Sequence, residues 1–240
     1  MIFPKNIIGP QFNNGDLVTF SFDDAEVTLR LPIIPINRHN TDKVSQLKDL
    51  RNANTNNWDV NDQSLPCLQL SEQHWSFEDA KTLDNIAQCF LYVSLVECTQ
   101  QDSAQKTLLE ADSFKALMLS WMDYSFAANE KGANGDSTQG RYKLRVIDKP
   151  HLSWLAAQVR YAPDASTSPV GIIPINNRFI VMVSLEIQSL HYAGRTNPYS
   201  DELLKQFEKD LFDDFLSHIK IEYGPELIEK IQALKSKTPA

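Results

Sequence analysis

The chain has 240 residues, of which 42% are hydrophobic and 22% charged, and its formal net charge is −8 at pH 7. These values are typical of a folded globular protein, and the acidic balance argues against a general nucleic-acid binder, which needs a basic face. No apolar run approaches the roughly 20 residues of a membrane helix, and the N-terminal sequence lacks the pattern of a secretion signal. Because the three cysteines form no CxxC pair, we expect reduced thiols in a soluble cytoplasmic protein that binds neither nucleic acid nor membrane.

The N-terminal part of the chain is predicted to begin with a β-hairpin. Residues 17–22 and 26–31 alternate apolar and polar side chains on either side of a short acidic turn. The two prolines of the next segment, LPIIPIN, lack backbone donors, so this segment should be extended at or near a sheet edge. Residues 52–64 are rich in asparagine and predict a long loop around Trp58.

The middle of the chain is predicted to alternate strands and helices. Residues 65–70 have the composition of a strand. A helix is predicted over 76–88, because Ser76 and Asp79 resemble a capping box. The run FLYVSLVEC that follows is rich in β-branched and aromatic residues and indicates a strand, with continuation of the helix as the alternative.

A second helix is predicted from about residue 102, with an apolar stripe at helical spacing. After a glycine-rich segment, strands are predicted over 142–147, 155–161 and 179–190. Ser200 is predicted to cap a long amphipathic helix whose apolar stripe extends to Ile219. Gly224 and Pro225 would end that helix and begin a short final one.

Two segments of the second half resemble segments of the first. The pentapeptide IIPIN occurs at 33–37 and again at 172–176, and the run FLYVSLVE at 90–97 resembles IVMVSLE at 180–186. A loop and a predicted helix follow each run. Our organising hypothesis is therefore two divergent copies of one β-hairpin–strand–helix unit; the alternative is that the pentapeptide and the shared VSL are coincidental.

The elements together predict an α+β fold in which one or two antiparallel sheets have amphipathic helices packed on one face. Residues 1–128 would form the first unit, with a polar insertion at about 38–88, and residues 141–240 the second. The segment 129–140, which holds three of the eight glycines, would be a linker or loop. The units would lie side by side or join their edges into one larger sheet.

No catalytic or metal-binding motif accompanies these elements. The five histidines show no HxH, HxxxH or HExxH spacing, and neither a GxSxG elbow nor a P-loop occurs. Adjacent carboxylates such as Asp201 and Glu202 indicate an acidic solvated surface, because acid–base catalysis needs carboxyl groups that face each other across a cleft. We therefore predict no catalytic residue, no metal ligand and no cofactor.

The sequence favours a protein-binding module (an adaptor, an inhibitor or an immunity-type protein) that acts through an acidic, aromatic-bearing surface. An acidic surface steers basic partners, so the expected partner is another protein with a basic surface. The candidate contact residues are four aromatic residues expected in loops and two arginines that follow the IIPIN segments. They are Trp58, Trp75, Tyr192, Tyr199, Arg38 and Arg178.

Two other classes of function stay open. One is an enzyme or small-ligand-binding protein whose residues converge only in the folded chain. Its sign would be a deep pocket that contains several of His74, Glu97, Arg178 and His191. The other is a structural homo-oligomer that assembles through a sheet edge or through the amphipathic helices.

Overall fold

Long antiparallel strands make up most of the structure. The computed structural model describes residues 7–33, 41–51, 54–60, 65–98, 108–130, 144–149, 152–160, 167–189 and 199–235. These residues form two sheets, three helices and one 3₁₀ turn at Thr55–Asn57. The α+β class and the antiparallel sheets predicted from the sequence are therefore confirmed.

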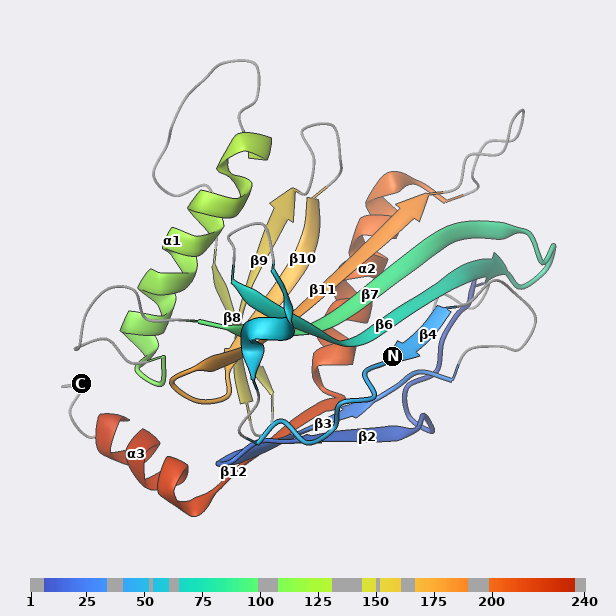
Figure 1. The fold of residues 1–240 in the computed structure, drawn as a ribbon. Helices are drawn as coiled ribbons and strands as arrows, with labels where there is room; N and C mark the ends of the chain where they lie inside the picture. The colour runs from blue at the N-terminus through green and yellow to red at the C-terminus, as the bar shows by residue number, and fades with distance from the viewer. Residues whose placement is uncertain are drawn as a thin grey trace.

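The main sheet has nine strands (Figure 1). Its strand order is β1-β6-β7-β11-β10-β9-β8, and β4 and β5 also pair with β6. The strands are β1 (Ile7–Ile8), β4 (Thr41–Val44), β5 (Asp59–Val60), β6 (Pro66–Asp79), β7 (Asn85–Glu97), β8 (Arg145–Lys149), β9 (Leu152–Arg160), β10 (Thr167–Pro174) and β11 (Phe179–Ser189). Strands from the two halves of the chain meet where β7 pairs with β11, so both halves contribute to one sheet.

A smaller sheet and three helices complete the fold. The small sheet has the order β12-β3-β2, with β2 (Leu17–Ser21), β3 (Ala25–Arg30) and β12 (Ile219–Tyr223). The helices are α1 (Ala111–Glu130), α2 (Asp201–Leu216) and α3 (Pro225–Lys235). None of these described helices combines the length and the apolar composition needed to cross a membrane.

The helices α1 and α2 pack on opposite faces of the main sheet. Successive side chains of a strand point to opposite faces, so the contacts of neighbouring residues on β10 distinguish the two faces. On β10, Val170 and Ile172 join an apolar cluster with Phe114 and Met118 of α1. Gly171, between them, faces α2 instead. The expectation that the helices share one face is therefore wrong, and the strands of the sheet centre bury side chains on both faces.

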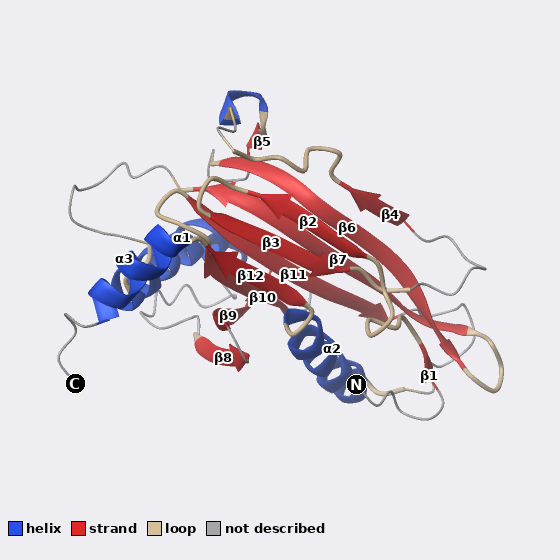
Figure 2. Ribbon diagram, turned by 90° about the horizontal axis from the view of Figure 1, so that it is seen from below, coloured by secondary structure: helices blue, strands red, loops and turns tan. Residues whose placement is uncertain are grey.

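The larger core lies on the face that α2 covers. Apolar side chains of α2, of the main sheet and of the small sheet meet there in a single cluster. Figure 2 shows the small sheet in front of the main sheet, with α2 beside it. Phe12 and Phe215 extend this cluster, with ring centroids 5.4 Å apart.

Several predicted elements are confirmed. The first hairpin forms as β2 and β3, and the runs FLYVSLVE and IVMVSLE lie in β7 and β11. Ser200 caps α2, since its hydroxyl accepts a hydrogen bond from the backbone N–H of Leu203 at 3.3 Å. The final helix begins at Pro225 as predicted.

Two helix predictions are wrong. Residues 76–79 continue β6, and after a turn β7 begins at Asn85, because Trp75 and Phe77 alternate with half-buried polar residues and fill the core. The long helix ends at Leu216, and Ile219–Tyr223 forms β12, which pairs with β3. In both segments, pairing with a distant strand outweighs the local helix signal.

The resemblance between the runs FLYVSLVE and IVMVSLE corresponds to a symmetric pairing of β7 with β11. β7 and β11 are adjacent, and their register is symmetric about the pair Val93 and Val183, so the two VSL segments are related by a local two-fold axis. Such an axis, perpendicular to the sheet, would place the following helices on one face, whereas α1 and α2 lie on opposite faces. Most of the first IIPIN segment and of the predicted linker 129–140 lies outside the described residues, and the duplication stays a hypothesis.

Candidate partner-binding surface

Trp75, one of the predicted contact residues, belongs to the core. Its side chain is 1% exposed and lies in the cluster beneath α2. Its ring packs edge-on against Phe77, with centroids 6.2 Å apart. Trp75 therefore cannot contact a partner, and the interpretation of it as a loop aromatic is wrong because it lies inside β6.

Trp58 and Arg178 come together around Phe179, at the start of β11. The Trp58 ring lies 5.8 Å from the Phe179 ring, and the Arg178 guanidinium lies 4.7 Å from its centroid. Arg178 also donates from Nε to Glu97 Oε1 at 2.5 Å, and the side chain of Glu97 is only 8% exposed. Arg178 is therefore engaged in neutralising a buried carboxylate, which is a structural role.

Tyr199 has a structural contact as well. Its hydroxyl donates to Asp79 Oδ2 at 2.9 Å, which ties the start of α2 to the β6–β7 hairpin. The remaining two predicted contact residues, Arg38 and Tyr192, lie outside the described residues. Of the four predicted contact residues that the structure describes, Trp58 and Arg178 are the two that lie together.

Of the described residues proposed for a spatially assembled active site, Glu97 and Arg178 lie together and His74 lies apart from them. Glu97 lies at the end of β7 beside Arg178, whereas His74 pairs in register with Phe90. Seven residues of extended strand separate these positions, or roughly 23 Å. His191 lies outside the described residues.

One part of the main sheet presents polar and aromatic side chains that no described helix covers. On the face where α1 packs, β6, β7 and β11 carry two adjacent rows of side chains. We call these six residues the Tyr92 surface: Glu72, Tyr92 and Ser184 in one row, and His74, Phe90 and Glu186 in the next. In Figure 1, α1 lies at the left on the β8–β10 side of the sheet, and β6 and β7 extend away from it to the right.

His74, Phe90 and Tyr92 of the Tyr92 surface are half-buried, and His74 and Phe90 stack on each other. The His74 imidazole lies parallel to the Phe90 ring, with centroids 4.3 Å apart and an interplanar angle of 11°. The Nε2 atom of His74 is buried, and no described residue gives it a hydrogen bond. Among the described residues, the stack therefore leaves the His74 Nε2 atom without a hydrogen bond.

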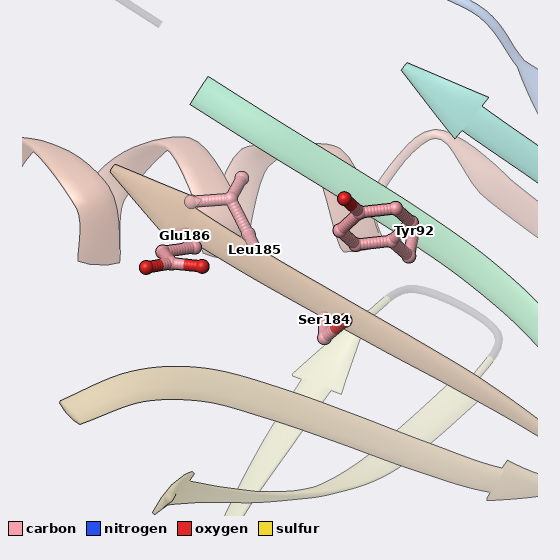
Figure 3. A pocket seen from close by; sticks show the side chains of 4 residues that line it. All are labelled: Tyr92, Ser184, Leu185 and Glu186. Carbon is pink, nitrogen blue, oxygen red and sulfur yellow. The ribbon is translucent and has the colours of Figure 1, made fainter. Parts of the chain in front are cut away.

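A shallow hollow of about 180 Å³ lies at the centre of this surface, lined by Tyr92, Ser184, Leu185 and Glu186. Figure 3 shows Tyr92 on β7 and the other three residues on the neighbouring strand β11. Pockets for drug-sized ligands usually have about 300–1,000 Å³. The hollow therefore matches one side chain better than a cofactor.

The carboxylates around the hollow differ in their partners. Glu72 pairs with Lys43 of β4 at 3.1 Å. Glu186 accepts a hydrogen bond from the Gln188 amide at 2.9 Å, and no described lysine or arginine pairs with it. Burial raises the pKa of the Tyr92 hydroxyl, and the negative charges of Glu72 and Glu186 raise it further. Both carboxylates thus act on the same aromatic side chain.

The thiols and the potential metal ligands of the described residues lack the features that a reactive site requires. Burial raises the pKa of the Cys98 thiol to about 12 and also raises the pKa values of Cys67 and Cys89, so the three thiols stay protonated at neutral pH. Within the described ranges, no group of three histidine, cysteine or acidic side chains is placed to hold a metal ion.

The sequence analysis missed Tyr92, Glu72 and Glu186. A usable signal was present, because polar atoms recur at alternate positions of two largely apolar runs, at Gln88, Tyr92 and Ser94 in one and at Ser184, Glu186 and Gln188 in the other. Polar residues at such positions indicate a face that is not covered. Which side chains of β7 and β11 become neighbours depends on the strand register, and this was not predictable from either strand alone.

Comparison of the chain with protein-family models, with curated proteins and with solved structures gives no match. A function for this protein is therefore argued from the geometry of the Tyr92 surface and from its charges.

Proposed function

We propose that the chain is a protein-binding module, of the adaptor, inhibitor or immunity type, and that the Tyr92 surface is the part that contacts the partner. The observation that carries this proposal is that Phe90, Tyr92 and Glu186 lie side by side on a sheet face that none of the described helices covers. Aromatic side chains are enriched in protein interfaces, where they contribute much of the binding energy. A carboxylate among them adds selectivity for a basic partner.

Two further features support a binding role. The surface lies on long paired strands, so its side chains are held at fixed spacing before a partner arrives. The free cysteines, Cys67, Cys89 and Cys98, fit a reducing compartment, and we propose that the protein acts in the cytoplasm.

Affinity purification of the tagged full-length chain from its source cells tests the proposal. We expect one protein to be recovered in constant ratio with the wild type, and to be lost when Phe90→Ala and Tyr92→Ala are combined. The matched control combines Gln206→Ala and Lys209→Ala, two exposed positions on α2, and should retain the partner. Thermal unfolding of each variant establishes that the fold is preserved.

Two outcomes would contradict the proposal. In one, the double variant on the Tyr92 surface retains the partner as well as the control does. In the other, the wild type is recovered alone at low and at high salt. Sedimentation of the purified chain separates the homo-oligomer alternative, since a dimer lost in the same double variant would assign this surface to self-association.

A further inference from the structure

We infer that the hollow beside Tyr92 receives a cationic side chain, arginine or lysine, from the partner protein. This inference rests on the proposed function and specifies what the surface recognises. It combines four features of the hollow: an aromatic ring, a carboxylate that no described lysine or arginine pairs with, a hydroxyl group and a volume of about 180 Å³.

The ring of Tyr92 and the carboxylate of Glu186 together favour a cation. A cation over an aromatic face is stabilised by about 0.5–1 kcal/mol at an exposed site and by about 2 kcal/mol when water is excluded. Tyr92 and Glu186 line the same hollow from adjacent strands (Figure 3). A cation placed between them would contact the ring and the carboxylate together.

The two carboxylates near the hollow differ in how their charges are compensated. Lys43 offsets the charge of Glu72, and Gln188 gives Glu186 only a neutral hydrogen bond. Among the described residues Glu186 therefore keeps an uncompensated charge on a half-buried side chain. A charge that is partly removed from water costs free energy unless it is paired, so a cationic partner group would remove this cost.

Anionic and apolar groups suit the hollow less well than a cation does. A phosphate or carboxylate group in the hollow would meet the Glu186 carboxylate, and like charges in an interface disfavour binding. An apolar side chain would cover Glu186 and remove it further from water without pairing its negative charge. Arginine and lysine share the positive charge and the long apolar stem that suit this hollow, and the experiment distinguishes them.

The test uses three small probes and the full-length protein. N-acetylarginine amide, N-acetyllysine amide and the neutral isostere N-acetylcitrulline amide are titrated separately, and binding is followed by ¹⁵N–¹H chemical shifts. We expect saturable shifts at residues 92, 184 and 186 with the cationic probes, at millimolar concentrations. Citrulline should bind at least about tenfold more weakly, since it has the shape of arginine without the charge.

Variants locate the interaction. Glu186→Gln should weaken binding of the cationic probes by roughly fivefold to tenfold and leave citrulline binding unchanged, a loss expected for one ion pair in a partly dry site. Glu202→Gln removes one negative charge from an exposed position on α2 and is the control for a change in net charge. Unfolding temperatures of both variants show whether the fold is intact.

Equal binding of citrulline and arginine, shifts confined to other residues, or no saturable shift with either cation would each overturn the inference. Preference for arginine over lysine would assign recognition to the planar guanidinium group, and equal binding would assign it to charge alone. If no cation binds but Phe90→Ala with Tyr92→Ala still abolishes partner recovery, the proposed function stands without this inference. If cations bind at the hollow but partner recovery is unaffected by that double variant, the proposed function is wrong.

Discussion

At the scale of single residues, Gly171 sets the distance between α2 and the main sheet. A methyl group at this position would lie 2.9 Å from Cζ of Phe212 and 3.5 Å from the two Cδ atoms of Leu216. Phe212 and Leu216 are fully buried, so neither side chain has free space to move into. The glycine is therefore required by a close approach, and not by its backbone conformation.

Gly171→Ala should lower the free energy of unfolding by about 1–3 kcal/mol, the usual cost of overfilling a packed core. In a strand, replacing glycine by alanine would otherwise be favourable by roughly 0.5–1 kcal/mol, so the sign of the effect tests the contact. Urea denaturation measures the change. Phe212→Leu in the same chain should reduce the cost of Gly171→Ala, and additive effects of the two substitutions would contradict this account.

The aromatic residues predicted to contact a partner have different environments in the structure. Trp75 lies in the core, Trp58 packs against Phe179, and Tyr199 holds the start of α2. Tyr92, which is half-buried on a face that no helix of the described ranges covers, is the aromatic residue on which the binding proposals depend. Residue type alone does not distinguish these environments, because each role needs a large ring with or without a polar atom.

At the scale of elements, side chains of α2 supply hydrogen bonds to β10 and β11 where these two strands no longer pair with each other. The last pair in the β10–β11 ladder is Val170 with Ser184, next to Pro169, which has no N–H to donate. Beyond this point, Glu208 Oε1 accepts from the backbone N–H of Ile187 at 3.0 Å. Lys205 donates to the backbone carbonyl of Thr167 and pairs with Glu208 at 3.0 Å. The two side chains thus bridge the strands.

Glu208→Ala should destabilise the fold by about 1–3 kcal/mol, because it leaves the buried N–H of Ile187 without an acceptor. Lys209→Ala, at an exposed position of the same helix, should change stability by less than about 0.5 kcal/mol. Chemical denaturation of both variants measures the difference. Equal effects would show that Glu208 does not support the strands.

The pH dependence of this effect has a definite sign. Burial raises the pKa of the Glu208 carboxyl, and Lys205 opposes that rise only in part. The folded chain therefore holds this proton to a higher pH than the unfolded chain does. The contribution of Glu208 to stability is complete below the unfolded pKa, near 4.3, and decreases as the pH rises through the folded pKa. The destabilisation by Glu208→Ala should accordingly be larger near pH 4 than at pH 7.

At the scale of the whole molecule, the two ends of the described chain share one sheet. β12, which follows α2, pairs along its length with β3 from the first hairpin. Val27 and Leu29 of β3 are fully buried in the cluster that also contains α2. The fold of the N-terminal hairpin therefore depends on residues near the C-terminal end (Figure 2).

A chain that ends at residue 218 should lose its cooperative unfolding transition, because β3 then has an unpaired edge above an incomplete core. A chain that ends at residue 224 keeps β12 and lacks only α3, and it should unfold in one transition at a lower temperature. Circular dichroism at increasing temperature compares the two. Cooperative unfolding of the shorter chain would show that β12 is dispensable.

Short-range patterns predicted a substantial part of the fold. Alternation of apolar and polar residues located β2 and β3, and the β-branched and aromatic runs located β7 and β11. The helix predicted over 76–88 was wrong because a capping pattern is a weak signal beside the burial of Trp75 and Phe77. The strand at 219–223 was hidden in a helical stripe because its partner, β3, lies near the other end of the chain.

The amino-acid sequence by itself determined the α+β class, the acidic balance of charge and the strands and helix ends that local hydrogen bonding and side-chain alternation specify. Only the tertiary structure decided that both halves build one sheet, that α1 and α2 cover opposite faces, and that Tyr92, Glu72 and Glu186 become neighbours. The physical reason is that strand order and register arise from pairing between distant segments. No local pattern contains that information.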